Sequence, residues 1–125
     1  MRVVIDTNVF ISALVFGGLP EQVLLRVIKE HQLVLSAYII TEINRILRVK
    51  FQIRPPSLRL LQEAMREAEM VYFDPYVHIL TDEPDNRILE TAEQGQAEYV
   101  ITGDKLLLDL KQYKDIVIIK PADFL

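Results

Sequence analysis

The strongest constraint on the fold of this chain is a regular alternation of short apolar runs with amphipathic stretches. The five apolar runs are Arg2–Asp6, Leu33–Ser36, Met70–Phe73, Glu98–Thr102 and Asp115–Ile119. Most are continuous rather than alternating, which is typical of parallel strands that are covered by helices on both faces. The pattern therefore predicts an α/β fold with a doubly wound parallel sheet.

The segments between these runs carry apolar residues at helical spacing. The expected helices are Asn8–Val15, Pro20–Glu30, Ala37–Arg48, Ser57–Glu69, Asp85–Gln94, Asp104–Leu110 and a final turn over Pro121–Leu125. Pro20 suits a first helical turn, and Gly95 suits a C-terminal cap. No linker, repeat or low-complexity segment interrupts the 125 residues, so we expect one domain over residues 1–125.

Composition narrows the possible functions. The chain has no cysteine, which excludes a disulfide framework and a thiolate metal site. Its longest apolar run, Val9–Phe16, is too short to span a membrane, and Asp6 breaks any secretory signal, so we expect a cytoplasmic protein with no membrane partner. The net charge of −4 argues against a general nucleic-acid binder, unless some of the acids hold cations.

Two acidic residues follow predicted strands. Asp6 ends the first run, and Asp104 follows the fourth after a glycine. In parallel α/β sheets the carboxyl ends of the strands border the ligand crevice, so both acids are candidates for a site there. The alternative for each is an N-terminal cap of the helix that follows, a role that Asp favours.

Two further acids lie on predicted helices. Glu42 borders an apolar stripe, and the alternatives are an exposed side chain packed at its edge or an ion pair with Arg45. Asp85 heads the inward stripe of its helix, and the alternative is a favourable interaction with the helix dipole. Four oxygen donors together suit Mg²⁺ or Mn²⁺ rather than zinc or copper, and such a site suits phosphoryl transfer or hydrolysis. Without metal the clustered carboxylates should raise the pKa of at least one of them.

Positive charge is concentrated between Arg45 and Arg66. Such a run is usually a solvated helix face, but beside an acidic crevice it would contact phosphates, and Arg45 and Arg48 are the candidates for substrate binding. His31 and His78 are interpreted as structural. No glycine-rich phosphate loop is present, because Gly17-Gly18 is not followed by Lys and Ser or Thr.

Five blocks of the sequence resemble the PIN-domain family in the same order. They are Asp6-Thr7-Asn8, Thr41-Glu42-Ile43, Asp82-Glu83-Pro84-Asp85-Asn86, Thr102-Gly103-Asp104-Lys105 and the closing segment Ile118–Leu125. The resemblance covers nearly the whole chain and is greatest to the small VapC-like toxins of toxin–antitoxin pairs. It implies a three-layer α/β/α sandwich around a five-stranded parallel sheet of order 3-2-1-4-5, and an endoribonuclease activity that depends on Mg²⁺ or Mn²⁺. It also implies frequent homodimers and inhibition by an antitoxin protein.

The resemblance assigns roles by position. Asp6, Glu42, Asp85 and Asp104 would be the catalytic, metal-binding acids, with Asn8, Asn86 and Thr102 as supporting polar residues. The chain departs from many members at Leu106, where they carry a second acid, which bears on the affinity for a second metal ion.

Two alternatives remain beside an RNA-cleaving enzyme. One is a Mg²⁺-binding receiver-type phosphoacceptor domain, which would require paired acids near the end of the first strand and a lysine at the end of a late strand. Asp6 has no acidic neighbour in the sequence, and Lys105 follows its acid. The other is a PIN-like binding module without catalysis, against which the presence of all four acids speaks.

Overall fold

A computed structural model describes residues 1–125, apart from the side chain of Ser57. One sheet organises the chain, and its strands lie in the order β3-β2-β1-β4-β6-β5. The strands are β1 (Arg2–Ile5), β2 (Gln32–Ser36), β3 (Glu69–Val71), β4 (Tyr99–Ile101), β5 (Gln112–Tyr113) and β6 (Ile116–Ile119). All neighbours are parallel except β5 and β6. The α/β class and the expected order of the five parallel strands are confirmed.

The sixth strand is the difference from the predicted sheet. β5 pairs antiparallel with β6, with Tyr113 opposite Ile116. Lys114, in the tight turn between them, adopts a φ of 53°, a left-handed conformation that Lys rarely takes. β5 consists only of exposed Gln112 and half-buried Tyr113, and two residues are too few to show the period of a strand. This edge hairpin therefore leaves no pattern in the sequence.

Helices occupy the expected segments with shifts of one or two residues at their ends. They are α1 (Thr7–Val15), α2 (Gly18–Glu30), α3 (Ala37–Val49), the short 3₁₀ turn η1 (Pro55–Ser57), α4 (Arg59–Glu67), α5 (Glu83–Gln94), α6 (Lys105–Leu110) and α7 (Pro121–Phe124). α4 is shorter than expected at both ends: it begins after Leu58, because Pro55 and Pro56 form the 3₁₀ turn instead, and it ends at Glu67.

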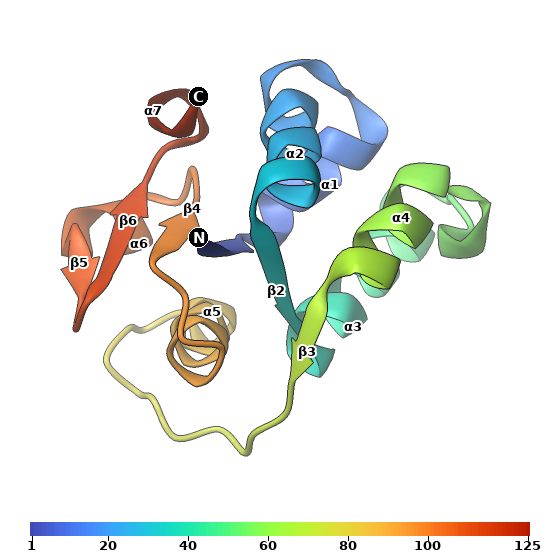
Figure 1. Ribbon diagram of the computed structural model, residues 1–125. Helices are drawn as coiled ribbons and strands as arrows, with labels where there is room; N and C mark the ends of the chain where they lie inside the picture. The colour runs from blue at the N-terminus through green and yellow to red at the C-terminus, as the bar shows by residue number, and fades with distance from the viewer.

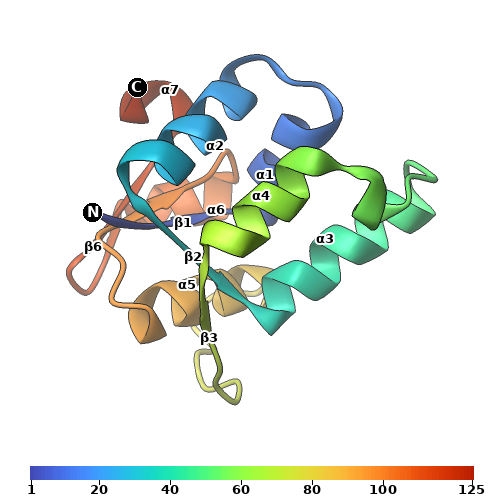
Figure 2. The same cartoon turned by 45° about the vertical axis from the view of Figure 1, so that its right-hand side comes forward.

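The helices cover both faces of the sheet. α5 packs against β1, β2 and β4, whereas α1 and α2 pack on each other at the opposite side (Figure 1). Turning the molecule shows α3 and α4 side by side, with α3 extending along the region next to α5 (Figure 2). The connection from β3 to α5 is a long loop, residues 72–82, which runs around the lower edge of the molecule in both views. β1 and β4 are parallel neighbours, so their carboxyl ends lie at the same edge of the sheet.

The core is formed by the central strands and the inward helix faces. Val3, Val4 and Ile5 of β1 are fully buried, as the continuous apolar run predicts. Among the described residues no single helix is long and apolar enough to cross a membrane; only the bent pair α1–α2, with 107° between its helices, meets the length and composition requirements. Both of these helices bury apolar side chains in the core, including Phe10 and Leu24.

Gly95 ends α5, but its φ of −86° is open to any residue, so space rather than conformation requires glycine there. A Cβ at this position would lie 2.4 Å from Cγ1 of buried Val34 and 3.0 Å from the carbonyl oxygen of Thr91. We expect Gly95→Ala to lower the free energy of unfolding by about 1–3 kcal/mol, because the strand or the helix end must move. Urea unfolding measures this loss. Gly103→Ala is the matched control, since a Cβ there meets nothing within 4 Å, and an equal loss in both variants would contradict the steric argument.

Candidate active site

Asp6 lies where β1 gives way to α1. Its backbone N–H donates to the carbonyl oxygen of Ile101 at 2.9 Å, so β1 and β4 end side by side. The hydroxyl of Thr102 donates to Asp6 Oδ2 at 2.6 Å, and both residues are buried. Although Asp6 occupies the N-cap position of α1, its side chain makes no capping hydrogen bond. The carboxylate is therefore held by the neighbouring strand end rather than by the helix that it precedes.

Burial raises the pKa of Asp6 above its ordinary value. The hydrogen bond from Thr102 and the nearby N–H groups of Thr7 and Asn8 act in the opposite direction, whereas the negative charge of Asp104 raises the pKa further. Asp6 and Asp104 thus lie close enough to repel each other, as the crevice interpretation predicts.

Asp104 is fixed by the start of α6. Its Oδ1 accepts hydrogen bonds from the N–H groups of Leu106 at 2.8 Å and Leu107 at 3.3 Å, so the capping alternative is correct for this residue. Its own N–H donates to Thr102 Oγ1 at 2.9 Å. Thr102 therefore links the two acids through a single hydroxyl. Capping and site roles are compatible here, because the cap uses one carboxylate oxygen and orients the other.

Asp85 is the most unusual of the acids. It is only 5% exposed, and its Oδ2 is buried without a hydrogen-bond partner among the described residues. Burial is the main reason that its pKa rises to about 7, and the negative charges of Asp104, Asp82 and Asp6 add to the rise. A raised pKa among the acids is the result that the sequence predicts. An unpaired buried carboxylate oxygen is costly, which indicates that a positively charged ligand completes this site.

Glu42 stands apart from these three acids. Its carboxylate accepts from Arg45 Nε at 2.9 Å and Arg45 Nη2 at 3.1 Å, and this bond is the main reason that its pKa lies below the ordinary value. The side chain is 32% exposed, at the edge of the apolar stripe as expected. The structure therefore brings together Asp6, Asp85 and Asp104. Glu42 lies apart from them on α3, where it pairs with Arg45.

The donor set fits a hard divalent cation. Asp6, Asp85 and Asp104 offer only oxygen atoms, and the buried unpaired Oδ2 of Asp85 is directly available as a ligand. Among the described residues, however, no three acidic or histidine side chains converge into a formed coordination group. A cation bound here would have to draw the repelling carboxylates together.

In the metal-free protein, kept in EDTA, we expect the free energy of unfolding to fall as the pH rises from about 4 to about 7. The pKa of Asp85 is about 7 in the folded chain and near 3.8 in the unfolded chain, so the folded state binds more protons in this interval. Ionisation on raising the pH therefore favours unfolding. Urea unfolding across this range measures the slope, which Asp85→Asn should reduce, leaving the contribution of Asp6, whose pKa is also raised. A slope unchanged from wild type in that variant would contradict the assignment; exposed Asp109→Asn is the control that should keep it.

Asn86 and Glu90 hold the loop before α5. Asn86 is fully buried; its Oδ1 accepts from Leu80 N at 3.0 Å, and its Nδ2 donates to Leu80 O at 2.9 Å. The fully buried carboxylate of Glu90 accepts from the N–H of Val77 at 2.8 Å and from that of Tyr76. Asn86 therefore supports the position of Asp85 through the loop and the helix start.

Arg87 completes this arrangement. Its Nε lies 2.5 Å from Glu90 Oε1, an ion pair in which the N–H does not point at the oxygen, and its Nη2 donates to Val77 O at 2.9 Å. Sequence reasoning missed the roles of Arg87 and Glu90. The sequence carried one signal for them: Arg87 and Glu90 are oppositely charged residues at i,i+3 spacing. Glu90 also lies within the segment Ile88–Ala92, whose apolar residues belong to the core.

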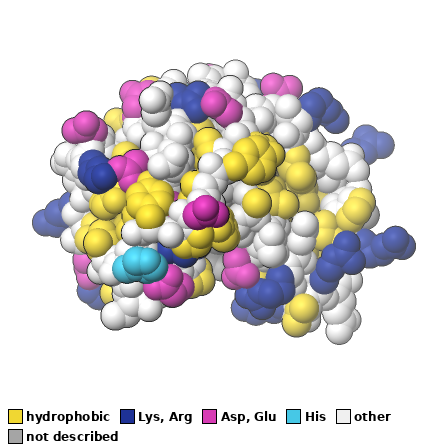
Figure 3. Space-filling view, turned by 90° about the horizontal axis from the view of Figure 1, so that it is seen from below, with side chains coloured by type: hydrophobic (Ala, Val, Ile, Leu, Met, Phe, Trp, Pro, Cys, Tyr) yellow, Lys and Arg dark blue, Asp and Glu magenta, His cyan; other side chains and the backbone are white. Residues whose placement is uncertain are grey.

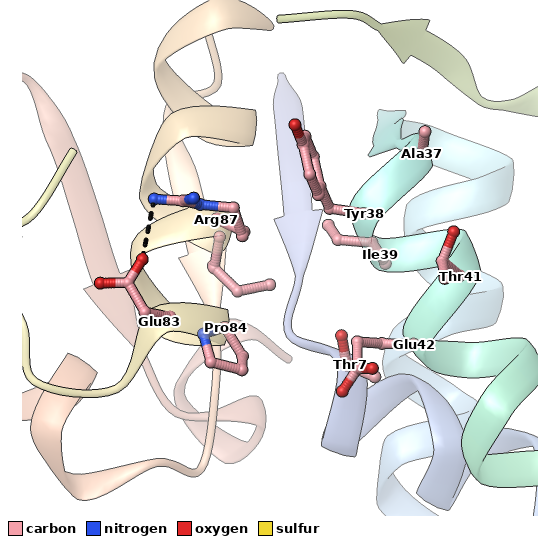
Figure 4. A pocket seen from close by; sticks show the side chains of 10 residues that line it. Thr7, Ala37, Tyr38, Ile39, Thr41, Glu42, Glu83, Pro84 and Arg87 are labelled. Carbon is pink, nitrogen blue, oxygen red and sulfur yellow. Dashed lines mark ion pairs between the residues drawn. The ribbon is translucent and has the colours of Figure 1, made fainter. Parts of the chain in front are cut away.

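A cleft of about 630 Å³ separates α3 from α5 beside the carboxylates. Figure 4 shows Tyr38, Thr41 and Glu42 on the α3 wall, with Glu83, Pro84 and Arg87 on the facing wall. Thr7, which directly follows Asp6, lies at the end of the cleft next to Glu42 (Figure 4). Asp6, Asp85 and Asp104 are not among the described lining residues, but their chain neighbours Thr7 and Pro84 are, so the cleft lies next to the acids.

The remaining candidates lie on the surface. Asn8 is exposed and lines a shallow depression next to Asp104. Arg45 and Arg48 lie on the exposed side of α3. Lys and Arg side chains gather on the side of the molecule where α3 and α4 lie (Figure 3). His78 is exposed near Glu83, and His31 packs its ring on Phe124, in keeping with structural roles.

Comparison with known proteins identifies the family. A sequence model of the PIN domain matches residues 2–106. This chain belongs to the PIN-domain family. A relative in sequence is "Uncharacterized protein MJ1680" of Methanocaldococcus jannaschii, which is 32% identical over an alignment of 125 residues, gaps included, that covers 89% of this chain and 76% of the relative.

The PIN fold is also found in a solved structure. This solved structure is the crystal structure of VapBC2 from Rickettsia felis bound to a fragment of promoter DNA. One of its chains superposes on this chain with a TM-score of 0.66. The match covers 96% of this chain and 98% of that chain at 13% identity, so it shows a shared fold. PIN domains are generally nucleases that use divalent metal ions. The resemblance stated from the sequence is confirmed, and the receiver-type alternative is excluded by family membership.

Proposed function

We propose that this PIN domain is a metal-dependent endoribonuclease and the toxin component of a toxin–antitoxin pair. The observation that carries the proposal is the group Asp6, Asp85 and Asp104 at the sheet end, with one buried carboxylate oxygen left without a partner. A PIN fold with this donor set suits hydrolysis of phosphodiester bonds.

Asp6, Asp85 and Asp104 would hold the cation, Mg²⁺ or Mn²⁺, with Glu42 joining from the facing wall. When bound, the ion would supply positive charge to the phosphate oxygens and lower the pKa of the attacking water. Thr102 orients Asp6 and Asp104 through its two hydrogen bonds. Asn86 and Glu90 fix the helix that carries Asp85, and exposed Arg45 and Arg48 would contact the phosphates of the RNA strand.

The test is cleavage of a panel of single-stranded and hairpin RNAs with Mg²⁺, Mn²⁺ or EDTA. We expect products with either metal and none in EDTA. Products that persist in EDTA would contradict the metal-dependent mechanism, and the same panel in DNA form would show whether the sugar matters.

The second candidate is a binding module that has lost catalysis. It is favoured by one observation: Glu42 is bound to Arg45 and lies outside the group of three acids. Calorimetric titration with Mn²⁺ separates the two candidates when combined with the RNA panel. Metal binding without cleavage of any RNA supports the binding module.

The partners follow from the same proposal. The Rickettsia felis match comes from a complex named VapBC2, and by analogy we propose an antitoxin protein as the inhibitor of this chain. We also propose a homodimer in the cytoplasm. Light scattering of the purified protein measures its mass, and a monomer at all concentrations would contradict the dimer.

A further inference from the structure

The cleft between α3 and α5 has features beyond those needed to hold a cation. It is bounded by Thr7, the residue after Asp6, and by Ile88, which lies one helical turn after Asp85. A nucleic-acid strand whose phosphate lies at the acids would therefore pass the mouth of this cleft. The cleft is larger than the phosphate group requires, which leaves room for another part of the nucleotide.

Two planar groups face each other across the cleft. Tyr38 projects from α3 and Arg87 from α5, with the guanidinium carbon 6.0 Å from the centre of the Tyr38 ring (Figure 4). A flat ligand on this face of the ring needs more room than this separation leaves, so Arg87 would have to move aside while Tyr38 stays in place. The Tyr38 ring packs on Phe73 at 5.3 Å between ring centres and its hydroxyl donates to Phe73 O at 3.4 Å, whereas Arg87 is bound by Glu90 and Val77. A ring that is already ordered loses little entropy when a flat ligand stacks on it.

The charges of the walls decide which part of a nucleotide can enter. Glu42 and Glu83 place a carboxylate on each wall, and each is paired with an arginine: Glu42 with Arg45, and Glu83 with Arg87 at 3.4 Å. Since Arg87 also pairs with Glu90, the described lining offers a phosphate no unpaired cation. A neutral base needs no cation, and carboxylates accept hydrogen bonds from the N–H groups on base edges. Unpaired bases in RNA are commonly bound by stacking on aromatic side chains and arginine planes.

We propose that the α3–α5 cleft is a subsite for one unpaired base of the RNA strand, with Tyr38 as its stacking surface. The inference rests on the proposed nuclease function, since it assumes a strand on the carboxylates. Tyr38 would then be a determinant of substrate choice. The enzyme would prefer RNA that is single-stranded next to the cleaved bond, because an unpaired base there is free to enter the cleft.

The experiment compares wild type with Tyr38→Leu. The probe is a short fluorescein-labelled single-stranded RNA of mixed sequence, used with a set in which one base at a time is removed to leave an abasic position. Binding is measured by fluorescence anisotropy in Ca²⁺, and cleavage in Mn²⁺. Tyr72→Leu is the matched control, because Tyr72 is 77% exposed and lies outside the cleft. Thermal melts establish that each variant is folded.

We expect Tyr38→Leu to weaken binding by roughly 5- to 100-fold, the range of one lost base stack, and Tyr38→Phe to recover most of that loss. One abasic position should weaken wild-type binding to a similar degree and have little further effect in Tyr38→Leu. This lack of additivity is the signature of a base on that ring. The Tyr72→Leu control should bind as wild type does.

Equal binding by wild type and Tyr38→Leu, or additive losses with every abasic position, would overturn the subsite and leave the cleft to another ligand, such as a segment of a protein partner. Failure of the proposed function gives a different result, which is the absence of cleavage by wild type with any metal. In that case the anisotropy series in Ca²⁺ still decides for or against the base subsite.

Discussion

Asp6→Asn is expected to reduce metal-dependent RNA cleavage by about 10³-fold, because the loss of a cation ligand removes several kcal/mol of charge stabilisation from the transition state. The fold should survive the change. An asparagine oxygen still accepts the hydrogen bond that Thr102 donates to Asp6, and removal of one charge relieves the repulsion between Asp6 and Asp104. We therefore expect the metal-free variant to be at least as stable as wild type.

The measurement is the initial rate of cleavage in Mn²⁺, together with urea unfolding in EDTA. The matched control is Asp109→Asn on α6, whose side chain is 63% exposed and pairs with Lys105. That control should cleave RNA at the wild-type rate. Full activity of Asp6→Asn would refute the assignment of the site, whereas an inactive variant that is also unfolded would show that Asp6 has a structural role.

Glu90→Ala is expected to lower the free energy of unfolding by about 3–5 kcal/mol, because removal of one member of a buried ion pair leaves the other uncompensated. Glu90 is fully buried, and the side chain of its partner Arg87 is 14% exposed. The change also leaves the N–H groups of Tyr76 and Val77 without their acceptor, which adds to the loss. The loop over residues 72–82 should then detach from α5.

Urea unfolding measures the stability, and amide hydrogen exchange at Val77 reports on the loop. The control is Glu63→Ala on the exposed face of α4, which should change stability by less than about 0.5 kcal/mol. Equal effects of the two substitutions would contradict the role of Glu90 as the anchor of the loop. Glu90→Gln is expected to lie between them, since an amide oxygen still accepts from Val77 although it no longer neutralises Arg87.

Most of the fold followed from local patterns. The continuous apolar runs predicted the five parallel strands, because strands covered on both faces have no polar alternation. The antiparallel β5 was missed, since its pairing depends on a tight turn at Lys114 and on no periodicity of its own. Gly95 was correctly placed at the end of α5, but the reason, its contact with Val34, is a tertiary one.

For the site, the sequence by itself placed Asp6 and Asp104 at the same edge of the sheet, because each acid closely follows a buried strand and parallel strands end at one edge. Only the tertiary structure decided which oxygen atoms are free. It pairs Glu42 with Arg45 and buries Asp85 Oδ2 without a partner. The physical reason is that strand ends are set by local periodicity, whereas the burial of Asp85 depends on the packing of α5 against the sheet. The pair of Glu42 and Arg45 is local to α3 and was one of the alternatives offered by the sequence, but only the structure shows that Glu42 takes it.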